Sequence, residues 1–277
     1  GSLIASNLVR GAGIGFARFN GGTFFPRVPG RTLSGLTAAY VSTNGALFDT
    51  SLADGFTVSQ NLLRDPDLGA AADGGLVKRG TNTLSLTGAA NTFNGPVRVE
   101  TGLLRARLGG TNDLAVATNA FFDALGERCT VGDLTGYGTL TNGVLAVTGR
   151  LDAGTNGAPA GARMTVQNLA LVGGATFACD WTTNALGQVT NDVAVVTGAL
   201  AAEGPGFFDL GRTEAKPVRL PFSATVMSYG SFSGSFAGWK AVNTGLPAGK
   251  SYATVVTAAG GTVTLDIRYS GTLLMVK

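Results

Sequence analysis

The sequence predicts an all-β protein of the solenoid class, in which short parallel strands stack coil upon coil. Composition is the first indication, because 43 of the 277 residues are glycine and only 13% are charged, although 44% are hydrophobic. Abundant glycine with few charges is typical of many short strands joined by tight turns, and the hydrophobic fraction is large enough to build a core. Periodicity is the second indication, since apolar and polar residues alternate along most of the chain, as they do in strands.

Strands are expected wherever this alternation runs between turn-forming residues. The clearest cases are residues 97–106, 138–149, 163–181 and 261–276. Asn-Gly pairs mark sharp corners between strands, because both residue types tolerate positive φ. Five such pairs occur, at Asn20-Gly21, Asn44-Gly45, Asn94-Gly95, Asn142-Gly143 and Asn156-Gly157.

Two other interpretations of these patterns are weaker. Residues 114–129 are the best helical candidate, because apolar residues from Leu114 to Leu125 recur at helical spacing. The strand-like sequence around them favours strands there as well. Asn-Gly pairs are also typical of two-residue hairpins, which would build an antiparallel sandwich. A loose repeat of about 20 to 25 residues favours the solenoid, with about 11 coils.

One part of the chain carries a recognisable repeat. Its four consecutive stretches are GLVKRG (75–80), TLSLTG (83–88), NTFNG (91–95) and VRVETGLL (97–104). Residues 74–106 as a whole resemble the passenger-associated, or autotransporter-associated, β-strand repeat of bacterial surface proteins. Pro96 departs from the family pattern, and because proline lacks a backbone donor we expect it at a corner, outside the strand ladder.

The resemblance implies a single-stranded, right-handed parallel β-helix, which we expect to include residues 14–211. It also implies an exported protein, extracellular or displayed on a Gram-negative-type cell surface, and it implies no single activity. We expect the chain to be one piece of a longer precursor. Its parts would be a parallel β-helix at 1–211 and, at 212–277, the last coils and a C-terminal cap of β-strands. A cap is needed because an open solenoid end exposes a sheet edge and an apolar cross-section.

Neither an enzyme nor a cofactor or metal site is predicted. Histidine is absent, which excludes Ser-His-Asp and Cys-His catalysis and most zinc sites. A glycoside hydrolase needs two carboxylates facing one groove. Asp65 and Asp67 are the nearest pair in sequence, but Asp-Pro-Asp is also ordinary loop sequence. Asp54 and Asp73 lie near this pair and are further candidate carboxylates. Asp113, Asp123 and Asp133 recur every ten residues, a spacing that does not match a coil.

Several partners are excluded by simple features. Nucleic acid is not expected, because the basic residues are scattered. No membrane span is expected, because no apolar run approaches about 18 residues.

Cys129 and Cys179 lie about two coils apart, roughly 9.6 Å at strand spacing, which exceeds the roughly 7 Å limit for a disulfide. We therefore expect two separate, buried thiols.

Aromatic residues gather near the C-terminus, at Tyr229, Phe232, Phe236 and Trp239. They are expected to plug the end of the core, and the alternative is a contact surface for sugar or a protein partner. The expected function is a non-enzymatic structural or adhesive segment of an exported surface protein. One alternative is a filament subunit that stacks end to end, and another is a carbohydrate-active β-helix enzyme. The partners implied are a second copy of the chain or surface polysaccharide.

Overall fold

The computed structural model describes residues 1–109, 112–154, 160–183, 189–210, 220–244 and 252–270. The chain forms two compact units, residues 1–149 and 150–277. Both are parallel β-helices built from short strands, which confirms the predicted fold class. The predicted division between 1–211 and 212–277 falls at residues 211–219, outside the described part, and so stays a prediction. The Asn156-Gly157 corner also lies outside it.

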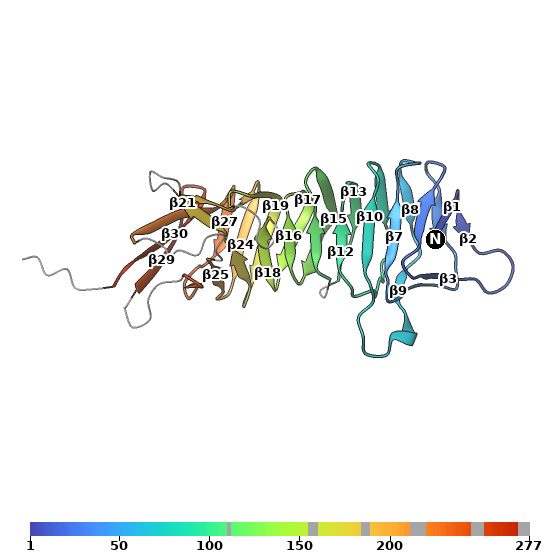
Figure 1. The fold of residues 1–277 in the computed structure, drawn as a ribbon, viewed down its shortest axis with the longest axis horizontal. Helices are drawn as coiled ribbons and strands as arrows, with labels where there is room; N and C mark the ends of the chain where they lie inside the picture. Colours follow the sequence, from blue (N-terminus) through green and yellow to red (C-terminus); the bar gives the residue numbers. More distant parts are fainter. Residues whose placement is uncertain (110–111, 155–159, 184–188, 211–219, 245–251, 271–277) are drawn as a thin grey trace, which may run out of the picture. The chain divides into compact units, whose positions relative to one another are not determined.

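The first unit consists of three rows of parallel strands (Figure 1). One row is β1 (Ser2–Ala5), β4 (Thr23–Pro26), β7 (Ala46–Asp49), β10 (Leu76–Arg79), β12 (Val97–Val99), β14 (Leu114–Val116) and β16 (Leu134–Gly136). The second is β2 (Leu8–Val9), β5 (Thr32–Ser34), β8 (Phe56–Val58), β11 (Thr83–Leu86), β13 (Gly102–Ala106), β15 (Ala120–Val131) and β17 (Thr139–Val147). The third is β3 (Phe16–Phe19), β6 (Ala38–Val41) and β9 (Leu62–Arg64). A loop after β9 holds the short 3-10 helix η1 (Pro66–Leu68).

The second unit continues this pattern and adds antiparallel strands. Its first row is β18 (Arg150–Ala153), β20 (Thr176–Ala178), β25 (Phe207–Asp209) and β28 (Lys240–Val242). The other strands are β19 (Arg163–Val172), β21 (Trp181–Thr183), β22 (Val189–Asn191), β23 (Val193–Val196), β24 (Ala199–Glu203), β26 (Phe222–Ser228), β27 (Ser231–Gly234), β29 (Tyr252–Ala259) and β30 (Thr262–Tyr269). β30 runs antiparallel to both β26 and β29. The sheet that contains β19, β23 and β26 therefore ends in the hairpin formed by β29 and β30. The first rows of the two units contain seven and four strands, as about 11 coils require.

The core of the first unit is made of side-chain columns that run from coil to coil. In one column, Ala46, Leu76, Val97, Leu114 and Leu134 are successive ladder partners, all buried. In the next, Phe48, Lys78, Val99 and Val116 follow one another. A lysine therefore occupies a core position, and its Nζ must find acceptors inside the protein.

The corners require the residues that the sequence supplies there. Gly75 has φ +70°, and a Cβ at this position would lie 1.9 Å from the carbonyl oxygen of Pro96, so only glycine fits. Pro96 directly precedes β12, and its carbonyl accepts the N–H of Leu76 at 2.9 Å. This confirms that Pro96 lies at a corner. Asn44 donates its backbone N–H and its Nδ2 to Oδ1 of Asn20, one coil earlier, at 3.0 and 2.9 Å.

Two further predictions concern residues 114–129 and the two cysteines. Residues 114–129 form β14 and most of β15, so the helical alternative is wrong. β15 turns a corner within its length, where Leu125 and Gly126 have positive φ and the register with β17 shifts. Cys129 and Cys179 are free and buried, as expected. Burial raises the pKa of both thiols.

Candidate functional site

The four aromatic residues singled out in the sequence form one continuous series of ring contacts in the second unit. Tyr229 follows β26, Phe232 lies in β27, and Phe236 and Trp239 lie between β27 and β28. Adjacent ring centroids are 5.6 Å apart for Tyr229–Phe232, 5.3 Å for Phe232–Phe236 and 5.1 Å for Phe236–Trp239. The middle pair is stacked nearly parallel, at 8°.

The series passes from the surface into the core. Phe236 and Trp239 are buried and both contact Phe208 of β25, at centroid distances of 5.9 and 5.0 Å. Trp239 also donates its Nε1–H to the carbonyl of Gly204 at 2.8 Å, which satisfies the indole and fixes its orientation. Tyr229 and Phe232 are only half-buried. The inner two rings therefore pack the core, and the outer two are accessible.

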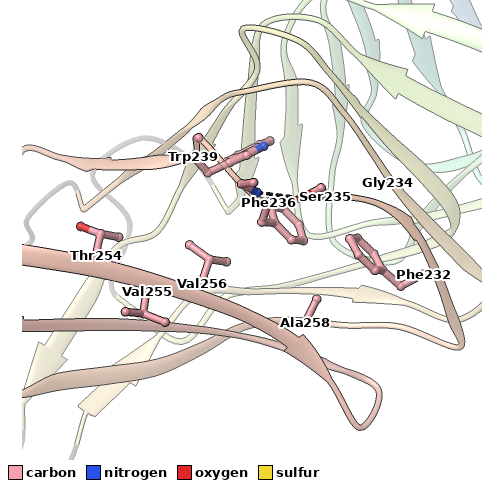
Figure 2. Close-up of a pocket in the computed structure, with 11 residues that line it drawn as sticks. Phe232, Gly234, Ser235, Phe236, Trp239, Thr254, Val255, Val256 and Ala258 are labelled. Carbon is pink, nitrogen blue, oxygen red and sulfur yellow. Dashed lines mark hydrogen bonds between the residues drawn. The ribbon is translucent and has the colours of Figure 1, made fainter.

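A groove of about 490 Å³ lies against the inner rings (Figure 2). One side is lined by residues between Phe232 and Trp239, and the other by four residues of β29, namely Thr254, Val255, Val256 and Ala258. Within the described residues, β27 pairs only with β24, and β29 pairs only with β30. The groove therefore lies between strands that each have an unpaired edge.

No titratable side chain is among the described residues that line this groove. It offers aromatic faces, the exposed apolar side chain of Val255 and strand backbone. These groups suit the apolar face of a sugar or an extended peptide.

The carboxylates that were candidates for catalysis form ion pairs and hydrogen bonds within the fold. Asp65 caps η1 by accepting the N–H of Asp67, and both acids contact Arg18, at 3.2 and 2.8 Å. Asp65 is buried and Asp67 is exposed, so the pair does not face one open groove. Asp123 accepts hydrogen bonds from Arg105 at 3.0 Å and from Asn142 at 2.8 Å.

Three other acids of that set, Asp54, Asp73 and Asp113, accept hydrogen bonds from backbone N–H groups. Oδ1 of Asp54 accepts the N–H of Thr83, and Oδ1 of Asp113 accepts the N–H of Asp133, at 3.2 and 2.9 Å. Asp73 is buried and accepts three such bonds, from Gly75, Asn94 and Gly95. Each of these bonds links one coil to another or closes a corner.

The burial of three acids in the second unit, Asp152, Asp180 and Asp209, was not predicted from the sequence. Asp152 and Asp209 stand on either side of Ala178 in one ladder, and Asp180 lies two residues beyond Ala178. All three acids are buried, and Arg150 contacts Asp209 at 2.5 Å. Burial raises the pKa of Asp152, which the nearby carboxylates raise further and Arg150 lowers. Among the described residues, no group of three or more ligand-type side chains is arranged to hold a metal ion.

Asp192 is a second case of this kind. It is buried and accepts the N–H groups of Gly161 and Ala162, both at 2.8 Å. Burial raises its pKa to about 6, although these hydrogen bonds act in the opposite direction. A sequence signal exists for the acids at 180 and 209, because each directly follows an apolar run, at 177–179 and 207–208.

Lys78 is the least expected residue of the repeat, because its side chain is fully buried. Its Nζ donates to the carbonyls of Arg79, Gly80 and Thr101, at 2.9, 2.6 and 2.9 Å. The first two lie at the end of its own strand and the third lies at the corner of the next coil. Burial lowers the pKa of Lys78 to about 8, against a smaller opposing effect of Asp49.

Comparison with known families identifies this part of the chain. Residues 76–106 match the passenger-associated-transport-repeat family. No protein with a curated description matches the chain. Within its described residues, the chain contains no helix that is long and apolar enough to cross a membrane. Residues 76–106 therefore carry one passenger-associated-transport repeat, set among the parallel strands of the first β-helical unit.

Proposed function

We propose that this chain is a structural segment of a protein exported to the bacterial surface, without enzymatic activity. The observation that carries the proposal is the position of the repeat, which lies within an uninterrupted series of parallel pairs from β7 to β14. In such a stack each coil is held by its neighbours, so rigidity accumulates coil by coil. A segment of this kind suits a protein that must hold other parts away from the cell.

Buried polar groups that join consecutive coils support this role. Thr50 donates to the carbonyl of Asn82, one coil later, and Asn82 donates back to the carbonyl of Thr50, at 3.0 and 2.8 Å. Asn112 donates to the carbonyls of Phe93 and Gly95, one coil earlier, at 3.2 and 2.8 Å. These bonds supply partners to carbonyl groups at the corners, where the hydrogen bonds between strands do not reach.

The absence of enzymatic activity is proposed from the engagement of the carboxylates. Asp65 and Asp67 are paired with Arg18, and Asp73 is saturated by backbone donors. A general acid or nucleophile must instead face its substrate. The described lining of the aromatic groove has no titratable residue, which favours binding over cleavage and supports an adhesive role with this groove as the proposed contact surface.

End-to-end stacking into a filament is the less favoured alternative. It requires a parallel sheet edge at each end. One sheet of the second unit instead ends in the antiparallel strands β30 and β29.

The proposal is tested by export. The chain is fused to the translocation unit of an autotransporter in Gram-negative cells, and intact cells are treated with protease. We expect antibody-accessible, protease-resistant chain at the surface and no release of reducing ends from a panel of acidic and neutral polysaccharides. Retention of the folded chain inside the cell, beside a displayed control passenger, would contradict the surface role. Cleavage of any polysaccharide would contradict the non-enzymatic role.

A further inference from the structure

A second groove of the second unit shares no lining residue with the aromatic groove. It encloses about 480 Å³, which is within the range of pockets that take small ligands. Its described lining comes from the start of β19 and from β22, β23 and β26. β19, β23 and β26 are neighbours in one sheet, whereas β22 belongs to the two-stranded sheet with β21. The groove therefore lies where the two sheets meet.

Buried hydrogen bonds hold the walls of this groove in place. The Nδ2 of Asn191 donates to the carbonyl of Thr225 at 2.8 Å, which ties β22 to β26. The next residue, Asp192, is buried and accepts the N–H groups of Gly161 and Ala162, which precede β19, both at 2.8 Å. The lining is thus fixed by the fold, so a ligand need not order it.

The lining of the groove is rich in hydroxyl groups. They belong to four residues, Thr190, Ser223, Thr225 and Ser228, and the first three are exposed. None of these hydroxyls makes a hydrogen bond to another group within the described residues. Neither an aromatic ring nor a large apolar side chain is among the described lining. Free hydroxyls both donate and accept, so this surface is complementary to a ligand that carries hydroxyl groups.

Arg163 supplies the only charge among the described lining residues. Its side chain is exposed and makes no ion pair or hydrogen bond within the described residues. The nearby acids have other partners. Asp192 accepts the two backbone N–H groups, and Asp266, which pairs with Ser223 across β26 and β30, lies 3.8 Å from Arg268. The unpaired guanidinium therefore makes the groove complementary to an anion.

We propose that this groove binds an acidic saccharide. The guanidinium of Arg163 contacts a carboxylate of the sugar, and the hydroxyls of Ser223 and Thr225 contact its hydroxyl groups. Arginine suits this role because its planar fork can donate two parallel hydrogen bonds to one carboxylate. An acidic peptide shares only the carboxylate with such a sugar, so it should bind more weakly. The inference does not depend on the function proposed above, because the purified chain can be tested for sugar binding without being displayed on a cell.

Isothermal titration calorimetry of the full chain with trigalacturonate tests the proposal. We expect binding that weakens as salt rises, and at least roughly tenfold weaker binding of galactotriose, which lacks the carboxylates. Arg163→Gln should lower the affinity for trigalacturonate about tenfold or more, because a charge-assisted hydrogen bond is lost. The double variant Ser223→Ala with Thr225→Val should lower it about tenfold, since it removes two hydroxyl partners.

Matched controls in the first unit separate this site from general attraction to anions. Arg98→Gln changes an exposed arginine and Thr87→Val an exposed threonine, so both variants should bind trigalacturonate as wild type does. Circular dichroism establishes that every variant is folded. The proposal is overturned if trigalacturonate does not bind at millimolar concentration, or if galactotriose or triglutamate binds as tightly. It is also overturned if Arg163→Gln leaves the affinity unchanged.

Discussion

Replacement of Lys78 by methionine tests the role of the buried lysine most sharply. Methionine is one atom shorter and keeps an unbranched apolar side chain, and it removes the ammonium that donates to Arg79, Gly80 and Thr101. The ammonium lies in the core column between Phe48 and Val99, so its charge is costly there. The three hydrogen bonds offset part of this cost, and the net contribution of Lys78 to the free energy of unfolding depends on pH.

The size of the effect follows from the pKa of Lys78, which burial lowers from 10.5 to about 8. This change corresponds to roughly 3 kcal/mol between the two protonation states. Between these pH values the unfolded chain keeps the proton and the folded protein has lost it, so the unfolded state binds more protons. The free energy of unfolding therefore rises with pH in this window, by about 2 kcal/mol between pH 7 and pH 9.5.

Urea unfolding followed by circular dichroism at the two pH values measures this effect. The stability of wild type relative to Lys78→Met should increase by about 2 kcal/mol from pH 7 to pH 9.5. Lys240→Met serves as the control, because Lys240 is exposed and its replacement should leave the pH dependence of wild type unchanged. The reasoning would be refuted if the free energies of unfolding of wild type and Lys78→Met differed by the same amount at both pH values.

Three further predictions concern corners and buried acids. Asp73→Ala should lower the free energy of unfolding by about 3 kcal/mol, because three buried N–H groups lose a charged acceptor. Asp67→Ala, at an exposed acid, should change it by less than about 1 kcal/mol in the same urea titration. Gly75→Ala should lower the melting temperature strongly, whereas Gly109→Ala, where a Cβ meets nothing within 4 Å, should not. Asp192 has a folded pKa of about 6, so its contribution to stability should fall as pH rises from 4 to 6, and melting curves of Asp192→Asn should lack this decline.

The fold class was predictable because its determinants are local. Alternation of apolar and polar residues fixes which side chains face the core, and glycine at positions such as Gly75 fixes the corner. The same reasoning places Pro96 outside the ladder, since its missing N–H would break a pair. The aromatic cluster was also visible in the sequence, but its division into buried Trp239 and accessible Phe232 was not.

What the sequence could not reveal depends on contacts between coils. Lysine is usually a surface residue, and the burial of Lys78 depends on a carbonyl 23 residues later, at Thr101. Asp152 and Asp209 lie on either side of Ala178 because of the register of β18, β20 and β25. This register cannot be read from the spacing of the residues along the chain.

Engineered disulfides test the central claim, the parallel register of coils through the passenger repeat. In a chain with Cys129 and Cys179 replaced by alanine, cysteines at Ser85 and Arg105 are direct partners of β11 and β13, and at about 4.8 Å they are within disulfide range. Cysteines at Thr57 and Arg105 lie two strands apart, at roughly 9.6 Å. The account predicts rapid oxidation of the first pair and none of the second. Failure of the Ser85–Arg105 pair to oxidise in the folded protein, or equal oxidation of both pairs, would contradict it.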